Sequence, residues 1–228
     1  MAGLMTRRAA CFGAAWMLAG CAGRTYGSGR RPPPGRVLIF PPHVTLGERV
    51  FGGVFRLRRD WSEAVRPAAL DAARKAVAAR RRAPVLLGSG DDPDAAWALA
   101  RLHRPVAESL LNFDAPQTGG RPPPTRGRPG LGEGGRAFAV RHDAPTGLFI
   151  SVTGGYAEGV QRVAEVVVAE ALGQEIEGAP RRVIVSLVEM ETGAILWAGA
   201  RADRAVRNPA RAAAHVHALI GKAGFARA

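Results

Sequence analysis

Apolar residues along the chain fall into short continuous runs separated by longer stretches with helical spacing. The runs predict strands at 37–40, 85–87, 148–152 and 183–190, with a hairpin partner at 194–197. The stretches between them predict helices at 60–82, 92–110, 158–172 and 209–221. This order predicts a single α/β domain over 36–225: a mixed β-sheet of about five strands with helices packed on it, closed by a carboxyl-terminal β-hairpin followed by a helix.

Local signals mark several of the predicted helix ends. Asp60 and Glu63 have the spacing of a capping box. Pro67 interrupts the same stretch, so that helix either kinks there or begins there. Asp92 and Asn208 each stand directly before a proline, which is typical of an N-cap followed by the first helical residue.

Other stretches lack both kinds of pattern. Residues 21–35 are rich in glycine, proline and arginine and predict a flexible tether. Residues 43–59 predict an irregular excursion, and 114–135, with three prolines at 122–124, predict a long surface loop. The glycine pairs 52–53 and 154–155 predict turns, because they lack the lysine and hydroxyl residue of a phosphate-binding loop.

The amino-terminal segment has the layout of a bacterial secretion signal. Arg7 and Arg8 precede an apolar run at 9–20, which is too short to span a bilayer. The sequence Leu-Ala-Gly-Cys at 18–21 resembles the lipobox at which lipoprotein signal peptidase cuts. The resemblance implies that 1–20 are removed and that Cys21 carries acyl chains. Ala22 fits sorting to the outer membrane, and the export route, general or twin-arginine, stays open.

Composition narrows the class of partner and of chemistry. The formal net charge is +13, but aromatic residues make up only 6% of the chain and none interleave with the basic runs as stacking platforms. We therefore expect no nucleic-acid partner and some attraction to anionic lipid headgroups or acidic envelope polymers. Cys11 leaves with the signal and Cys21 is consumed by lipid, so no thiol remains for a disulfide, a metal site or a nucleophile.

Candidate catalytic and metal-binding groups are sparse. Asp91, Asp92 and Asp94 share a glycine-containing loop but lack the spacing of a calcium loop. His215 and His217 lie two apart in a predicted helix, which points them to nearly opposite sides, so solvated surface positions are the better interpretation. The remaining groups considered are His43, His103 and His142, which have no nucleophile at a meaningful spacing, and Trp61 and Trp197, which we interpret as packing residues. We predict no catalytic residue, metal or cofactor, and hence no enzyme.

Two parts of the chain carry a family resemblance. In the first half these are the residues at 37–42, 52–53 and 60–64; in the second, those at 147–149, 154–156 and 185–197. Together they resemble a family of uncharacterised proteobacterial envelope lipoproteins over most of 36–215. More distantly the layout is similar to the amino-terminal domain of the Tol-system propeller protein and to the curli-secretion channel lipoprotein. The resemblance implies an α/β domain at the periplasmic face of the outer membrane, with a role in envelope assembly or transport.

The leading hypothesis is a lipid-anchored accessory that acts without catalysis by binding other envelope proteins. The main alternative is a subunit of an oligomeric outer-membrane secretion channel. By analogy with the channel-forming relatives, the segment at 156–178 would then build the pore or the contact between copies. A third hypothesis, a hydrolase of envelope polymers, requires a histidine and a carboxylate together in a cleft.

Overall fold

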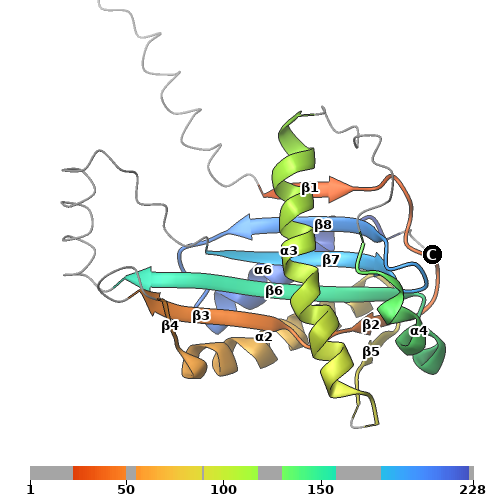
Figure 1. Cartoon of the computed structure of the whole chain (residues 1–228), viewed down its shortest axis with the longest axis horizontal. Helices are drawn as coiled ribbons and strands as arrows, with labels where there is room; N and C mark the ends of the chain where they lie inside the picture. Colours follow the sequence, from red (N-terminus) through yellow and green to blue (C-terminus); the bar gives the residue numbers. More distant parts are fainter. Residues whose placement is uncertain (1–22, 50–54, 89, 118–129, 158–180, 226–228) are drawn as a thin grey trace, which may run out of the picture.

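The computed structural model describes residues 23–49, 55–88, 90–117, 130–157 and 181–225. Within these ranges one mixed sheet of eight strands has helices on both faces (Figure 1). The predicted α/β class, the mixed sheet and the closing hairpin followed by a helix are confirmed. The sheet has eight strands rather than about five, because several stretches predicted as irregular pair with it.

Strand β6 organises the sheet. In sheet order the strands are β1 (Arg24–Gly27), β8 (Ile195–Ala202), β7 (Arg182–Glu189), β6 (Thr146–Ala157), β2 (Val37–Ile39) and β5 (Pro84–Leu86), with β3 (His43–Arg49) and β4 (Phe55–Leu57) beside the far half of β6. Both β2 and β3 pair in parallel with β6, at 146–148 and at 151–157 respectively. Pro41 and Pro42, which have no backbone N–H, separate the two.

Helices cover the two faces of the sheet and divide the core into two layers. Helices α2 (Arg59–Ala79) and α6 (Pro209–Lys222) lie on one face, and α3 (Pro93–Gln117) crosses the other, as Figure 1 shows. Successive side chains of β7 alternate between them: Val185 packs in the α2 and α6 layer, and Ile184 packs in the α3 layer. None of the helices described combines the length and hydrophobicity that a membrane crossing requires.

The predicted tether at 21–35 is partly wrong. Residues Arg24–Gly27 form β1, which pairs antiparallel with β8. Tyr26 packs against the α3 layer of the core, and Arg30 makes a two-point ion pair with Glu189 at 3.1 Å. An edge strand needs only backbone hydrogen bonds to one neighbour, so β1 leaves no trace in the hydrophobic pattern.

Two glycine-containing stretches were predicted as irregular structure but contain strands. The expected excursion at 43–59 contains β3, β4 and the start of α2, and Gly52-Gly53 lies outside the described residues. Gly154 and Gly155, predicted as a turn, lie inside β6 opposite Leu46 and Gly47. A Cβ on Gly47 would overlap the carbonyl oxygen of Arg56 and the ring of Phe55. Glycine at these positions permits close approach of neighbouring chains rather than a change of direction.

Helix boundaries follow the predicted caps at two places and depart at a third. Asp92 and Asn208 cap α3 and α6, each accepting two backbone N–H bonds. Helix α2, by contrast, begins at Arg59, has no side-chain cap and continues through Pro67. Asp60 lies in its first turn, where it is hydrogen-bonded to Arg58 instead of capping the helix.

The predicted loop at 114–135 is only partly irregular. Residues up to Gln117 belong to α3, and η2 (Glu133–Gly135) leads directly into α4 (Arg136–His142), a helix that no sequence signal indicated. Residues 118–129 lie outside the described part of the chain. So do the signal segment with Cys21, the helix predicted at 158–172 and nearly all of the segment at 156–178.

Candidate functional site

Two aromatic rings and three guanidinium groups gather where β3 and β6 end and β7 begins. Five residues from four parts of the chain form this arginine–aromatic cluster: Arg58 before α2, Trp61 in the first turn of α2, Tyr156 near the end of β6, Arg181 before β7 and Arg207 before α6. The rings of Trp61 and Tyr156 meet edge-on, 5.5 Å between centroids and 87° between planes. This contact gives the arginines a fixed aromatic base.

Each arginine of the cluster stacks on a ring. The guanidinium carbon of Arg58 lies 4.6 Å from the Trp61 ring centroid, and that of Arg181 lies 4.8 Å from the Tyr156 centroid. Arg207 reaches both rings, at 5.3 Å from Trp61 and 5.0 Å from Tyr156. Such contacts stabilise by about 0.5–1 kcal/mol each at exposed sites, so the cluster is held partly by its own charges.

The three arginines differ in how their charge is balanced. Arg58 donates two hydrogen bonds to Asp60, at 3.0 and 2.9 Å, and also contacts Glu48. The hydrogen bonds from Arg58 keep the pKa of the exposed Asp60 carboxyl below its usual value. Arg181 donates its Nε hydrogen to the carbonyl of Gly155 at 2.7 Å. Within the ranges that the structure describes, no carboxylate pairs with Arg207, whose side chain is exposed.

Tyr156 remains a neutral phenol within this positive surrounding. Burial raises the pKa of its hydroxyl, and the charges of Arg181 and Arg207 oppose that rise. Its Oη accepts the backbone N–H of Arg207 at 2.8 Å, which ties the turn before α6 to the end of β6. The cluster can therefore present to an anionic group a positive surface whose arginines rest on the partly buried Trp61 and the buried Tyr156.

A histidine–carboxylate pair lies in the neighbouring turn. Asp203, just after β8, accepts a 2.5 Å hydrogen bond from His215 Nε2 on α6. Burial opposes ionisation of Asp203, but the hydrogen bonds from His215 and from the backbone of Ala205 hold its pKa below the usual value. The prediction that His215 is solvated is wrong, because this pairing draws it inward; His217 is exposed, as predicted.

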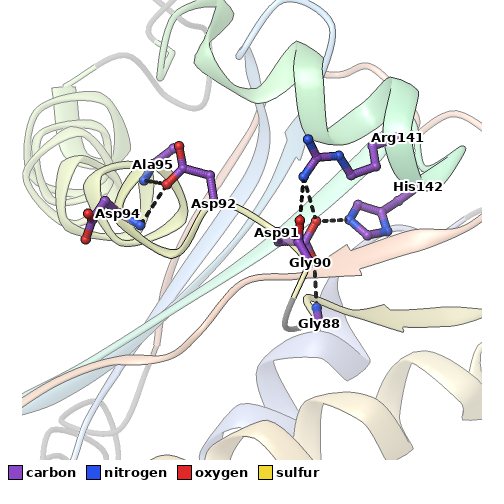
Figure 2. A network of polar contacts seen from close by, with 8 residues as sticks. All are labelled: Gly88, Gly90, Asp91, Asp92, Asp94, Ala95, Arg141 and His142. Atoms are coloured by element: carbon purple, nitrogen blue, oxygen red, sulfur yellow. Dashed lines mark hydrogen bonds and ion pairs between the residues drawn. The ribbon is translucent and has the colours of Figure 1, made fainter.

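A second pair, drawn in Figure 2, joins the loop after β5 to α4. Asp91 accepts from His142 at 2.6 Å, from Arg141 at 3.5 Å and from the backbone of Gly88 at 2.6 Å. Burial opposes ionisation, but the His142 hydrogen bond and the others hold the pKa of Asp91 below its usual value. Arg141 also donates to the carbonyl of Gly90. Together these bonds hold the loop between β5 and α3 against α4.

The three aspartates considered as a cation site do not converge. Asp92 uses its carboxylate to cap α3 through the backbone of Asp94 and Ala95, and Figure 2 shows Asp91 directed elsewhere. Among the described residues, no group of three or more His, Cys, Asp or Glu side chains is placed to hold a metal ion. Asp91 and Asp92 instead accept hydrogen bonds from the protein's own backbone and side chains.

Of the remaining histidines, His103 is on α3 and His43 begins β3. His103 Nε2 and Ser186 Oγ are 2.8 Å apart, and both residues are fully buried. A serine–histidine contact can serve nucleophilic catalysis, but a substrate has no access to this one. Burial, with a smaller contribution from His43, lowers the pKa of His103 to about 3. The pKa of His43 is lowered too, by burial first and then by the charges of Arg104, Arg101 and Arg66.

Trp61 and Trp197, the two tryptophans interpreted as packing residues, both contact the core as predicted, although Trp61 has the additional role described above. Trp61 and Trp197 are partly buried against the α2 and α6 layer. The arginine–aromatic cluster was not predicted, because its members are spread from 58 to 207 with no common spacing. The only available signal was Trp61 and Tyr156 within the segments that carry the family resemblance.

No family model and no curated protein matches the chain. Among solved structures, a point variant of the PelC dodecamer from Paraburkholderia phytofirmans is 14% identical, with 89% of this chain and 95% of that chain covered and a TM-score of 0.37. A second PelC dodecamer from the same organism is 13% identical, with coverage of 89% and 93% and a TM-score of 0.34. Similarity this low says nothing about what the present chain does.

Proposed function

We propose that this chain is a lipid-anchored protein at the periplasmic face of the outer membrane, which assists envelope assembly or transport by binding other envelope proteins. The secretion signal and the lipobox-like sequence ending at Cys21 support the anchor. The arginine–aromatic cluster carries the binding function. The proposed role is not catalytic.

The chemistry of the cluster is that of a protein-binding surface. Arginine, tryptophan and tyrosine are the residues most enriched among those that dominate binding energy at protein interfaces. Trp61 and Tyr156 are already fixed against each other, so little side-chain entropy would be lost on binding. The guanidinium of Arg207 is exposed and stacked on both rings. An acidic segment of the partner would complement it.

The two histidine–carboxylate pairs support structural rather than catalytic roles. Asp203 and His215 join the turn after β8 to α6, and Asp91 and His142 join the loop after β5 to α4. Each carboxylate also accepts a backbone N–H, from Ala205 and Gly88 respectively. In both pairs the carboxylate therefore joins a side chain to the backbone of its own turn, which is the arrangement of a structural contact.

Crosslinking in intact membranes followed by mass spectrometry tests the proposed binding surface. Arg207→Ala should reduce specific crosslinks about tenfold, which is the loss expected of a residue central to an interface. Arg204→Ala is the matched control, because Arg204 is an exposed arginine of the same turn outside the cluster. Equal crosslinking by the two variants, or capture of abundant bystanders alone, would contradict the proposed surface.

A channel subunit is the second candidate, and the edge strand β4 favours it. Phe55 and Leu57 on that strand are 41% and 50% exposed, and among the described residues β4 pairs only with β3. A second copy could cover this apolar edge. Size-exclusion chromatography in detergent should then give a large discrete mass that Phe55→Ser disperses and Val140→Ser, at a 78% exposed position on α4, does not. A mass corresponding to a monomer or dimer would instead favour the accessory protein over the channel subunit.

A further inference from the structure

The start of β1 limits how far the domain can stand from its anchor. Arg24, the first residue of β1, is three residues after Cys21. Three residues span at most about 11 Å even when fully extended. A flexible tether of fifteen residues at 21–35 would have allowed the domain to move freely relative to its anchor. With only two residues between Cys21 and the paired strand β1, the domain must stay close to the anchor. If Cys21 is acylated, as the proposed function requires, β1 lies close to the lipid headgroups.

Strand β1 is one edge of the sheet and β4 belongs to the other. The path between them runs through β8, β7, β6 and β3, as Figure 1 shows. Adjacent strands are about 4.8 Å apart, so these five steps place β4 about 24 Å across the sheet from β1. The arginine–aromatic cluster lies beside β6 and β3, toward the β4 edge. The anchored edge and the proposed binding surface are therefore well separated.

The chain around the anchor is cationic. Residues 23–36 contain four arginines and no acidic residue. Arg24 is exposed and its guanidinium donates to the neutral side-chain oxygen of Asn112, at 3.1 Å, so its charge is not cancelled there. Arg30 is paired with Glu189, and Arg31 is exposed. Arginines held close to a bilayer are attracted by anionic headgroups.

We infer that the β1 edge of the sheet rests on the membrane surface, with anionic lipid headgroups as the partner of Arg24. The sheet then stands edge-on to the bilayer, and the β4 edge points into the periplasm. This inference rests on the proposed lipidation of Cys21. It assigns to β1 a membrane-contacting surface and to the arginine–aromatic cluster a position away from the bilayer.

Single-cysteine labelling of the full-length, lipidated protein tests this orientation. Mature protein has no other free thiol if Cys21 is acylated, so an introduced cysteine reports one position. Thr25→Cys and Arg56→Cys are matched, since both are exposed middle residues of edge strands at opposite edges. In phosphatidylglycerol-containing vesicles, a membrane-impermeant maleimide should react several-fold more slowly at Thr25→Cys than in detergent micelles, and equally fast in both at Arg56→Cys.

Two further variants separate the contribution of the arginine charge from that of the short distance between the anchor and β1. Arg24→Gln in the Thr25→Cys background should raise the labelling rate in anionic vesicles about fivefold, the factor that one arginine contributes near such a surface. A long Gly-Ser insert between Ala22 and Gly23 should raise it as well, by removing the limit on distance. Slowing that is as strong in purely phosphatidylcholine vesicles would overturn anionic lipid as the partner.

Intact mass distinguishes failure of the orientation from failure of the anchor. Acylated Cys21 together with equal labelling at the two positions would overturn the edge-on orientation and leave the proposed anchor standing. An unmodified amino terminus would overturn the anchor itself, and with it the basis of the inference. Slow labelling at Thr25→Cys that both variants relieve would support the membrane contact of β1.

Discussion

At the scale of single residues, His103 shows how one buried group makes stability depend on pH. It lies inside the α3 layer, where it stacks on Phe149 at 5.4 Å and shares a hydrogen bond with Ser186. Burial favours the neutral imidazole and lowers its pKa to about 3. The unfolded chain has no such restraint, and its histidines titrate near pH 6.5. Acid therefore favours the unfolded state at this position.

We expect the free energy of unfolding to decrease as the pH is lowered, partly because of His103. The folded pKa lies below the unfolded one, so the contribution of His103 is fully present above about pH 6.5 and is lost as pH falls toward 3. Between pH 6.5 and 5 the loss should be about 1–2 kcal/mol. In urea unfolding, His103→Gln should be less pH-dependent by this amount, and the exposed control His217→Gln should match the parent protein. Parallel curves for all three proteins would contradict the prediction.

Two glycines in edge-region strands should differ in their tolerance of a methyl group. A Cβ on Gly47 would overlap the backbone of β4, whereas a Cβ on Gly27 would meet no atom within 4 Å. We expect Gly47→Ala to lower the free energy of unfolding by about 1–3 kcal/mol. Gly27→Ala should change it by less than about 0.5 kcal/mol. Equal effects in denaturant titrations would argue against the β3–β4 pairing described here.

At the scale of elements, the side-chain caps distinguish helices that begin alike in sequence. Asn208 accepts two N–H bonds at the start of α6, whereas the Asp60–Glu63 pair does not cap α2. Asn208→Ala should therefore cost about 1 kcal/mol of stability and Glu63→Ala almost nothing. Thermal unfolding followed by circular dichroism measures both. A comparable loss of stability from Glu63→Ala would indicate that the capping box predicted from the Asp60–Glu63 spacing does form.

The hydrophobic pattern predicted the elements that the core surrounds and missed those at its margins. The run at 183–190 corresponds to β7, whose residues 183–188 are all buried, because a strand covered on both faces needs apolar side chains on both. Strands β1 and β4 are mostly exposed, so backbone pairing rather than side-chain burial defines them. Helix α4 is a short element of seven residues and carries too little periodicity to detect.

The candidate site could not be predicted from sequence for a related reason. Trp61 and Tyr156 lie on segments that the pattern placed in a helix and next to a strand, but their contact depends on how α2 lies against β6. The same holds for Asp203 and His215, whose pairing buries a histidine predicted to be solvated. Tertiary contacts of this kind join residues that share neither spacing nor motif. Cys21, by contrast, was identified from a local motif and stays a prediction.

At the scale of the whole molecule, the two core layers share the same central strands. Leu111 belongs to the α3 layer and Val216 to the α6 layer, and both layers rest on β6 and β7. Loss of either layer would therefore expose one face of those strands to water and remove support from the layer on the opposite face. Unfolding should be a single cooperative transition.

Truncation in one layer tests this cooperativity. Leu111→Ala should lower the free energy of unfolding by about 2–5 kcal/mol, the usual cost of a cavity at a fully buried leucine. In a Trp97→Phe background, which removes the tryptophan on α3, fluorescence of Trp61 and Trp197 reports the opposite layer. Its midpoint should shift together with the far-ultraviolet signal. A fluorescence transition left at the parental denaturant concentration would show that the layers unfold separately.

The position of β1 also determines the mechanical behaviour of the protein. A force applied to the amino terminus acts first on β1, which is held by four residue pairs of a single antiparallel ladder, Arg24↔Ala200 to Gly27↔Trp197, and by its contacts with α3. Pulled outward from the edge, such a ladder separates one pair after another rather than all at once. The weakest link under tension thus lies between the terminus and the layered body, which would keep its packing while the first strand peels away.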